Sequence, residues 1–116
     1  MNMMSLNSSW TNVAIGGGGY VTGLVQSSNA AYARCDVGGA YLLPFKDGNA
    51  TLHRGTWRSL LDWVPPRLSN YYSIESIAVE SVSARQSDDV VYIAVGDGFR
   101  TPSAILRSVD GGALTV

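Results

Sequence analysis

The stretch Thr22-Gly23-Leu24-Val25 is followed 53 residues later by a similar one, Glu75-Ser76-Ile77-Ala78. Two further pairs of short runs keep the same order, at offsets of 60 and 64 residues: Tyr32-Ala33 with Tyr92-Ile93, and Ala40-Tyr41-Leu42 with Ala104-Ile105-Leu106. A unit of three or four strands with this period is typical of a propeller blade with long loops, since blade repeats run at roughly 40 to 50 residues. The repeat predicts two successive blades. The simple alternative is a β-sandwich with chance similarity between strands.

The rest of the chain shows short apolar runs separated by turn-forming residues. No window of a dozen residues sustains helical periodicity, and clusters of Gly, Asn, Asp, Ser and Pro interrupt the pattern. Strands are predicted at residues 21–26, 30–34, 40–43, 56–61, 74–79, 90–95 and 104–107. The 13 glycines among 116 residues suit many tight turns. We therefore predict an all-β chain without helices of any length.

The composition disfavours several classes of protein. Eight Lys and Arg against nine Asp and Glu give a net charge of −1, so there is no basic excess for nucleic acid or an anionic membrane surface. Hydrophobic residues make up 46% of the chain and charged residues 15%, which indicates a buried core rather than disorder. No stretch approaches the roughly 20 apolar residues of a membrane span. Residues 1–10 lack the pattern of a signal peptide.

Cys35 and His53 are the sole cysteine and the sole histidine. One of each makes neither a disulfide nor a zinc motif, so we expect no metal site and no cofactor. Nothing in the sequence gives a Cys35–His53 pair a catalytic context, and exposure in a polar turn is the preferred interpretation of His53. The glycine run 16–19 is not followed by Gly-Lys-Ser/Thr, which favours close backbone packing over a phosphate loop.

Ser108-Val109-Asp110-Gly111-Gly112 matches the opening of the Asp-box, Ser-x-Asp-x-Gly-x-Thr-Trp, a hairpin motif of sialidase-like and related propellers. Its chemistry is structural: Ser108, Asp110 and Gly112 are expected to build the turn, with the Asp110 carboxylate accepting backbone N–H bonds. The match ends there, because Leu114 stands where Thr belongs and the Trp is absent. The motif favours a propeller and carries no catalytic information.

A longer resemblance begins with Trp10-Thr11-Asn12-Val13-Ala14-Ile15-Gly16-Gly17-Gly18-Gly19-Tyr20-Val21-Thr22-Gly23. This stretch resembles the start of the mature catalytic domain of family 74 glycoside hydrolases, which are xyloglucanases and include reducing-end-specific cellobiohydrolases. The resemblance continues through residues 32–41, 73–79 and 104–112. Its most specific string is Arg34-Cys35-Asp36-Val37-Gly38-Gly39-Ala40-Tyr41.

The resemblance implies both a fold and a reaction. Family members have two seven-bladed β-propellers and hydrolyse the β-1,4-glucan backbone of xyloglucan with inversion. The expected fold is therefore a partial β-propeller of about two four-stranded blades from a seven-bladed, Asp-box-type propeller. The expected division is a tail at 1–9, a first blade with its leading strand at 10–64, and a second, incomplete blade at 65–116. Members of the family are secreted, whereas residues 1–10 of this chain do not predict a signal peptide.

Asp36 is the catalytic residue that the resemblance implies, as the general base. Its partner, the general acid, belongs to the second propeller and is not expected in this chain, so the isolated chain is expected to be inactive. From the residues alone, the favoured interpretation of Asp36 is an Asx-turn residue that caps the glycine turn, and the resemblance reverses that preference. Its place between the second and third strands puts it on the face where propellers usually bind ligands.

Several aromatic residues are candidates for stacking on sugar rings or for packing between blades. The candidate substrate-binding residues are Tyr41, Trp63, Tyr71 and Tyr72. Among the remaining acids, Glu75 is expected in a buried network with backbone amides, Asp88-Asp89 in a solvated turn, and Asp97 in a glycine-flanked turn.

Two other functions remain open. A non-catalytic Asp-box propeller fragment would bind a glycan or a protein partner. Alternatively, several copies of the chain would close a ring by self-association through exposed blade edges.

Overall fold

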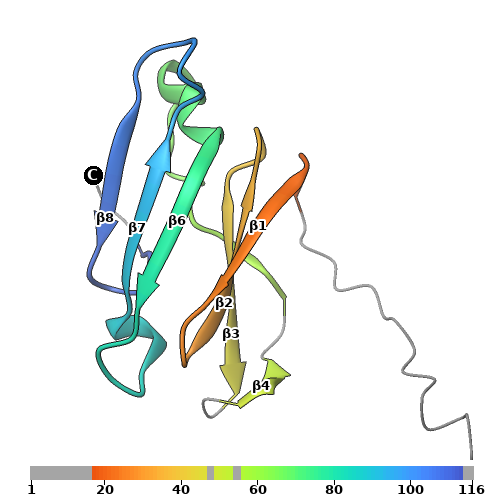
Figure 1. Cartoon of the computed structure of the whole chain (residues 1–116), viewed down its shortest axis with the longest axis vertical. Helices are drawn as coiled ribbons and strands as arrows, with labels where there is room; N and C mark the ends of the chain where they lie inside the picture. The colour runs from red at the N-terminus through yellow and green to blue at the C-terminus, as the bar shows by residue number, and fades with distance from the viewer. Residues whose placement is uncertain (1–16, 47–48, 54–55, 114–116) are drawn as a thin grey trace, which may run out of the picture.

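Two antiparallel β-sheets make up the described part of the molecule. The computed structural model describes residues 17–46, 49–53 and 56–113. The first sheet has the order β1-β2-β3-β4, with β5 also paired to β3, and the second has the order β6-β7-β8 (Figure 1). The strands are β1 Val21–Gln26, β2 Ala30–Cys35, β3 Ala40–Lys46, β4 Asn49–His53, β5 Arg58–Ser59, β6 Ile74–Glu80, β7 Val90–Val95 and β8 Ala104–Ser108. The predicted all-β fold is confirmed.

The first sheet departs from the predicted strands at its outer edge. The predicted strand 56–61 contracts to β5, and β4 was predicted as a turn. β4 has the sequence Asn-Ala-Thr-Leu-His, with one β-branched residue, and it pairs with β3 across an irregular register. Its short polar–apolar alternation was not recognised as a strand. β3 continues to Lys46, beyond the predicted end at residue 43, and includes Pro44.

Two short 3₁₀ helices contradict the expectation that the chain has no helix. They are η2, Pro66–Tyr72, and η3, Gln86–Asp88. Each is closed by local bonds such as the N–H of Leu68 to the carbonyl of Pro65, at 2.9 Å. Segments this short do not produce a readable apolar period. Within the described ranges, no helix is long and apolar enough to cross a membrane.

The internal repeat is visible in the pairing of the strands. The first strand of each sheet carries an irregularity of register, between Val21 and Gly23 in β1 and between Ile74 and Ser76 in β6. These two bulges are 53 residues apart, as the repeat predicts. The similarity is therefore one of backbone geometry as well as of sequence.

The third strands of the two sheets are offset by 65 residues rather than the predicted 64. Arg34 of β2 pairs with Ala40, whereas Ala94, its counterpart 60 residues later, pairs with Ile105. Ala40 thus corresponds to Ile105 and not to Ala104. The prediction aligned Ala40 with Ala104 because both strands begin with alanine. The pairing of the strands, and not residue identity, decides which face of the sheet each side chain occupies.

The main core lies between the two sheets. Tyr32 and Leu42 project from the first sheet toward the second, where Ile77 and Ile93 meet them. Alternate residues of a strand share a face, so one set of side chains from each sheet fills this space. Further buried members of this core are Ala30, Ala40, Leu60, Leu61, Val64, Ile74, Val91, Val95 and Leu106.

The second sheet also has an outward face that carries exposed apolar residues. Tyr92 is 41% exposed and Ile105 is 76% exposed. Arg107 lies over the Tyr92 ring, 5.7 Å from its centroid, and its Nε donates to the Tyr92 hydroxyl at 3.1 Å. By register, Tyr92 corresponds to Tyr32, whose face is covered by the second sheet.

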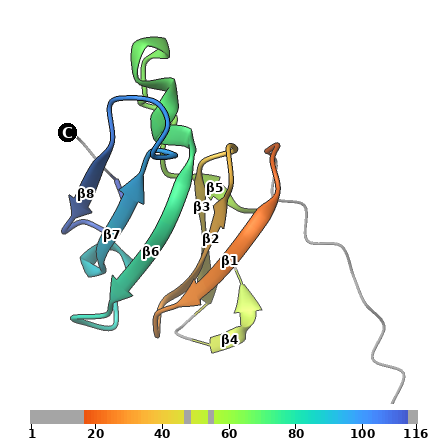
Figure 2. The same cartoon turned by 45° about the horizontal axis from the view of Figure 1, so that its top comes forward.

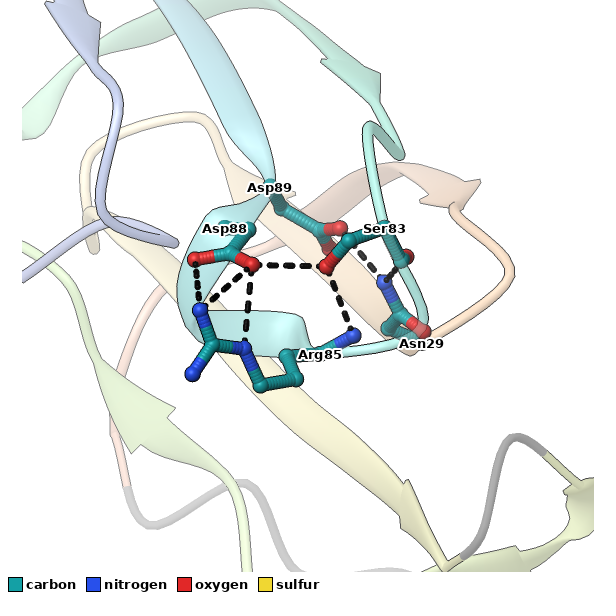
Figure 3. Close-up of polar contacts among 5 residues, drawn as sticks. All are labelled: Asn29, Ser83, Arg85, Asp88 and Asp89. Carbon is teal, nitrogen blue, oxygen red and sulfur yellow. Dashed lines mark hydrogen bonds and ion pairs between the residues drawn. The ribbon is translucent and has the colours of Figure 1, made fainter.

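Asp89 corrects a prediction: it is completely buried between the sheets and not in a solvated turn. Its Oδ2 accepts hydrogen bonds from the hydroxyls of Ser27 and Tyr32, both at 2.8 Å. Its Oδ1 accepts one from Asn29 Nδ2 at 2.8 Å (Figure 3). The neighbouring Asp88 forms a partly exposed ion pair with Arg85. Asp89 therefore connects the β1–β2 turn to the β6–β7 loop. Burial raises the pKa of Tyr32, which keeps that hydroxyl a donor.

The turn after β8 is organised by Ser108. Its Oγ accepts the N–H of Gly112 at 2.9 Å and that of Asp110 at 3.2 Å, and it donates to the Asp110 carboxylate. Gly111 and Gly112 both adopt positive φ, at 71° and 90°. The backbone N–H bonds in this turn thus reach the serine hydroxyl, where the carboxylate was expected to accept them. The Asp-box assignment itself stays a prediction.

Candidate active site

Asp36 lies in the loop that joins β2 to β3, at the end of the first sheet where β1 begins (Figures 1 and 2). Its Oδ1 accepts the N–H of Tyr20 at 2.9 Å and the N–H of Val37 at 2.8 Å. Its own N–H donates to the carbonyl of Tyr20 at 2.9 Å. Two bonds therefore hold the exposed carboxylate, and the third holds the backbone of Asp36.

These hydrogen bonds also set the charge of Asp36. The N–H groups of Tyr20 and then Val37 lower the pKa of the carboxyl group, because they stabilise the ionised form. The carboxylate is therefore charged at neutral pH and can accept a proton. Among the described residues, the ion pairs are Arg85 with Asp88 and Arg100 with Asp97, so no described cation neutralises Asp36.

Glycines on two segments let the backbone close around this carboxylate. A Cβ on Gly38 would lie 1.8 Å from the carbonyl oxygen of Gly18, and Gly19 adopts a φ of 96°. For residues 17–19, the expected close backbone packing is observed. The glycine segment supports the loop that holds Asp36.

We expect Gly38→Ala to displace this loop, because the obstructing atom belongs to the backbone and cannot rotate away. The overpacking should cost about 1–3 kcal/mol of stability. In ¹H–¹⁵N NMR spectra, the amide signals of Tyr20 and Val37 should shift strongly. Gly18→Ala is the matched control, since a Cβ there meets nothing within 4 Å. Similar spectra for the two variants would contradict this account.

The predicted aromatic residues occupy different surroundings. Tyr72 contacts the Asp36 loop: its carbonyl accepts the N–H of Gly39 at 2.8 Å, and its ring would lie 3.4 Å from a Cβ on Gly39. Tyr41 is only 7% exposed, and its hydroxyl donates to the carbonyl of Gly38 at 2.8 Å. Trp63 and Tyr71 contact each other edge to face at 6.5 Å and are half-buried. Tyr41 thus lies beneath the loop, and Tyr72 lies beside it.

Glu75 and Cys35 take no part in a catalytic arrangement. Glu75 is exposed at the bulge of β6, so the expected buried network with backbone amides is wrong. Cys35 is 1% exposed, and burial raises the pKa of its thiol, which opposes thiolate formation. His53 is described only through its backbone in β4. In the described residues, no three His, Cys, Asp or Glu side chains gather in a metal-binding group.

A pocket of about 250 Å³ lies at the turn after β8, and no residue of the Asp36 loop lines it. Its lining includes Arg58, Gln86 and Asp110. Gln86 has a structural role in this turn, since its Nε2 donates to the carbonyl of Gly111 at 2.7 Å. The pocket is therefore separate from the candidate base.

Comparisons with known proteins were made by sequence and by fold. No family sequence model matches the chain. It is 40% identical over 111 residues to xyloglucanase Xgh74A of Acetivibrio thermocellus and 35% identical over 114 residues to a xyloglucanase of Hypocrea jecorina. It is 30% identical over 105 residues to the oligoxyloglucan-reducing end-specific xyloglucanase of Emericella nidulans.

These alignments cover nearly all of the chain but little of each relative. They include 89%, 90% and 87% of this chain, which spans 12% of the length of each of the three relatives. The fold matches the crystal structure of the Niastella koreensis GH74 enzyme with a TM-score of 0.63 and 33% identity. That match covers 89% of this chain and 14% of the other.

Proposed function

Because this chain belongs to the family 74 glycoside hydrolases, matching them in sequence and in fold, we propose that it supplies two propeller blades and the general base of a xyloglucan-hydrolysing enzyme. The observation that carries the proposal is the exposed Asp36 carboxylate, held through Oδ1 by two backbone N–H groups. The blades comprise residues 10–64 and 65–116. An extracellular location is part of the proposal.

In this mechanism, Asp36 uses Oδ2, which takes part in neither of those two bonds. Oδ2 accepts a proton from a water molecule as the water oxygen attacks the anomeric carbon. The glycosidic C–O bond breaks on the opposite face, and the leaving oxygen takes a proton from a carboxylic acid outside the two blades. Inversion requires this second carboxyl group at roughly 6.5–9.5 Å from the base, with the water between them.

The aromatic residues have different roles in this proposal. Tyr72 has the best position for a sugar subsite, because it touches the loop that carries Asp36. Trp63 and Tyr71 would act together as an edge-to-face pair. Tyr41 would act chiefly by supporting the loop through its bond to Gly38.

The test is a chimeric enzyme in which this chain replaces the aligned segment of the Acetivibrio thermocellus xyloglucanase. We expect the chimera to release oligosaccharides from xyloglucan. ¹H NMR during the first minutes should show the new reducing ends in the inverted, α configuration. A folded chimera without hydrolysis, beside an active parent enzyme, would contradict the proposal and favour a non-catalytic binding fragment.

A further inference from the structure

Phe99 is the most exposed of the large apolar side chains in the described part of the molecule. It is 96% exposed, at the tip of the loop that joins β7 to β8. This loop and the Asp36 loop lie at the same end of the two sheets (Figures 1 and 2). Large apolar side chains are usually buried, because exposing them to water is unfavourable. A phenylalanine that is almost fully exposed is therefore a candidate for contact with a ligand.

The loop that carries Phe99 is fixed by hydrogen bonds. Asp97 Oδ1 accepts the N–H groups of Phe99 at 3.0 Å and Arg100 at 2.9 Å. From beneath, the 4% exposed Asn70 donates through Nδ2 to the carbonyls of Arg100 at 2.9 Å and Pro102 at 3.0 Å. Because the backbone is held on both sides of the residue, a ligand would meet a ring whose support is already in place.

The charge around Phe99 indicates what kind of ligand fits. Arg100 Nε lies 2.7 Å from Asp97 Oδ2, so the two charges in the loop compensate each other. The apolar ring therefore stands in a nearly neutral setting. A pyranose ring matches this chemistry, because it is neutral and presents its axial C–H groups as an apolar face that an aromatic ring can cover.

We propose that Phe99 is a stacking platform for a pyranose ring of the polysaccharide, forming a subsite at the end of the blades where Asp36 lies. This proposal rests on the proposed function for the identity of the ligand. It adds a second blade to the binding surface, so that substrate would contact loops from both sheets. Phe99 is not among the residues predicted from the sequence, although the preceding Gly-Asp-Gly indicates a turn.

The experiment compares Phe99→Ala, Phe99→Tyr and a control in the chimeric enzyme. We expect Phe99→Ala to raise the KM for xyloglucan about tenfold, the loss of roughly one stacking contact, with kcat changed less than about twofold. Phe99→Tyr should stay within about twofold of wild type, because the ring face is kept. Val82→Ala is the control: Val82 is 58% exposed in the β6–β7 loop, at the opposite end.

Binding by the full 116-residue chain separates this proposal from the proposed hydrolysis. Xyloglucan and cello-oligosaccharides would be titrated and followed by ¹H–¹⁵N NMR. If the chimera is inactive but Phe99→Ala alone weakens binding in the titration, the platform stands and the catalytic proposal fails. If both ligands bind equally, the platform contacts the glucan backbone; preference for xyloglucan assigns it to the branched substrate. Sugar affinity that is unchanged in Phe99→Ala overturns the platform and leaves a protein contact as the role of Phe99.

Discussion

Asp36→Asn should lower the kcat of the chimeric xyloglucanase about 10³-fold, since a positioned general base contributes roughly 10² to 10⁴. The amide can still accept the N–H bonds of Tyr20 and Val37 through its oxygen, so the loop should keep its shape. It cannot accept the proton of the attacking water. We therefore expect KM to change little, and initial-rate kinetics on xyloglucan would measure both constants.

The matched control for this variant is Asp88→Asn. Asp88 is also a carboxylate whose pKa is lowered, first by the Ser83 hydroxyl and then by Arg85, but it lies in the loop at the other end of the sheets. Its removal should leave kcat within about twofold. A comparable loss in both variants would mean that the Asp36 effect is structural, and an active Asp36→Asn enzyme would exclude this residue as the base.

The pH dependence of the wild-type chimera follows from the same hydrogen bonds. The base must be ionised, and the N–H groups of Tyr20 and Val37 lower its pKa. The acidic limb of the kcat/KM profile should therefore fall below the ordinary range for an aspartate. In Gly38→Ala, which loses those bonds, the limb should move to higher pH.

Replacing Asp89 by alanine should destabilise the chain by about 3–5 kcal/mol. The variant leaves the buried hydroxyls of Ser27 and Tyr32 and the Asn29 amide without their shared acceptor. Each unsatisfied buried polar group costs about 1–3 kcal/mol, and partial entry of water reduces the sum. Domains of this size have only about 5–15 kcal/mol in total, so the variant would lose a large share of the stability.

The comparison with the adjacent aspartate makes this prediction specific. Asp88→Ala removes an ion pair in which Arg85 is 77% exposed, and such pairs contribute about 0–1 kcal/mol. Urea unfolding followed by circular dichroism would measure both variants. Equal destabilisation by the two substitutions would show that the buried network does not hold the sheets together.

Strand positions could be predicted where local sequence decides them. The strands at residues 21–26 and 90–95 are observed with the predicted limits. Each is a run that contains several β-branched residues and lies between turn residues. β4 was missed because its pairing depends on β3 and not on its own composition. The one-residue shift of β8 was also invisible, since register is a property of two strands.

The residues considered for the candidate site also differ in whether local sequence could predict their surroundings. Asp36 was predicted as the base from a motif that is local and continuous in sequence, and this role stays a prediction. Asp89 was misread because Asp88 and Asp89 look alike as a turn dipeptide, and only the packing of the two sheets separates a buried acceptor from a solvated one. Glu75 failed for the opposite reason: its strand is buried on one face, and the bulge leaves this side chain outside.

The position of Arg107 has a consequence for handling the isolated chain. β8 is the edge strand of the second sheet, and an edge with exposed apolar side chains such as Ile105 is a site for strand addition and aggregation. Arg107, the last residue but one of that strand, places a positive charge over the Tyr92 ring. Charged residues in this position act as gatekeepers, because a second strand would have to bury or displace the charge. We therefore expect the solubility of the chain at high concentration to depend on a guanidinium group that takes no part in the proposed reaction.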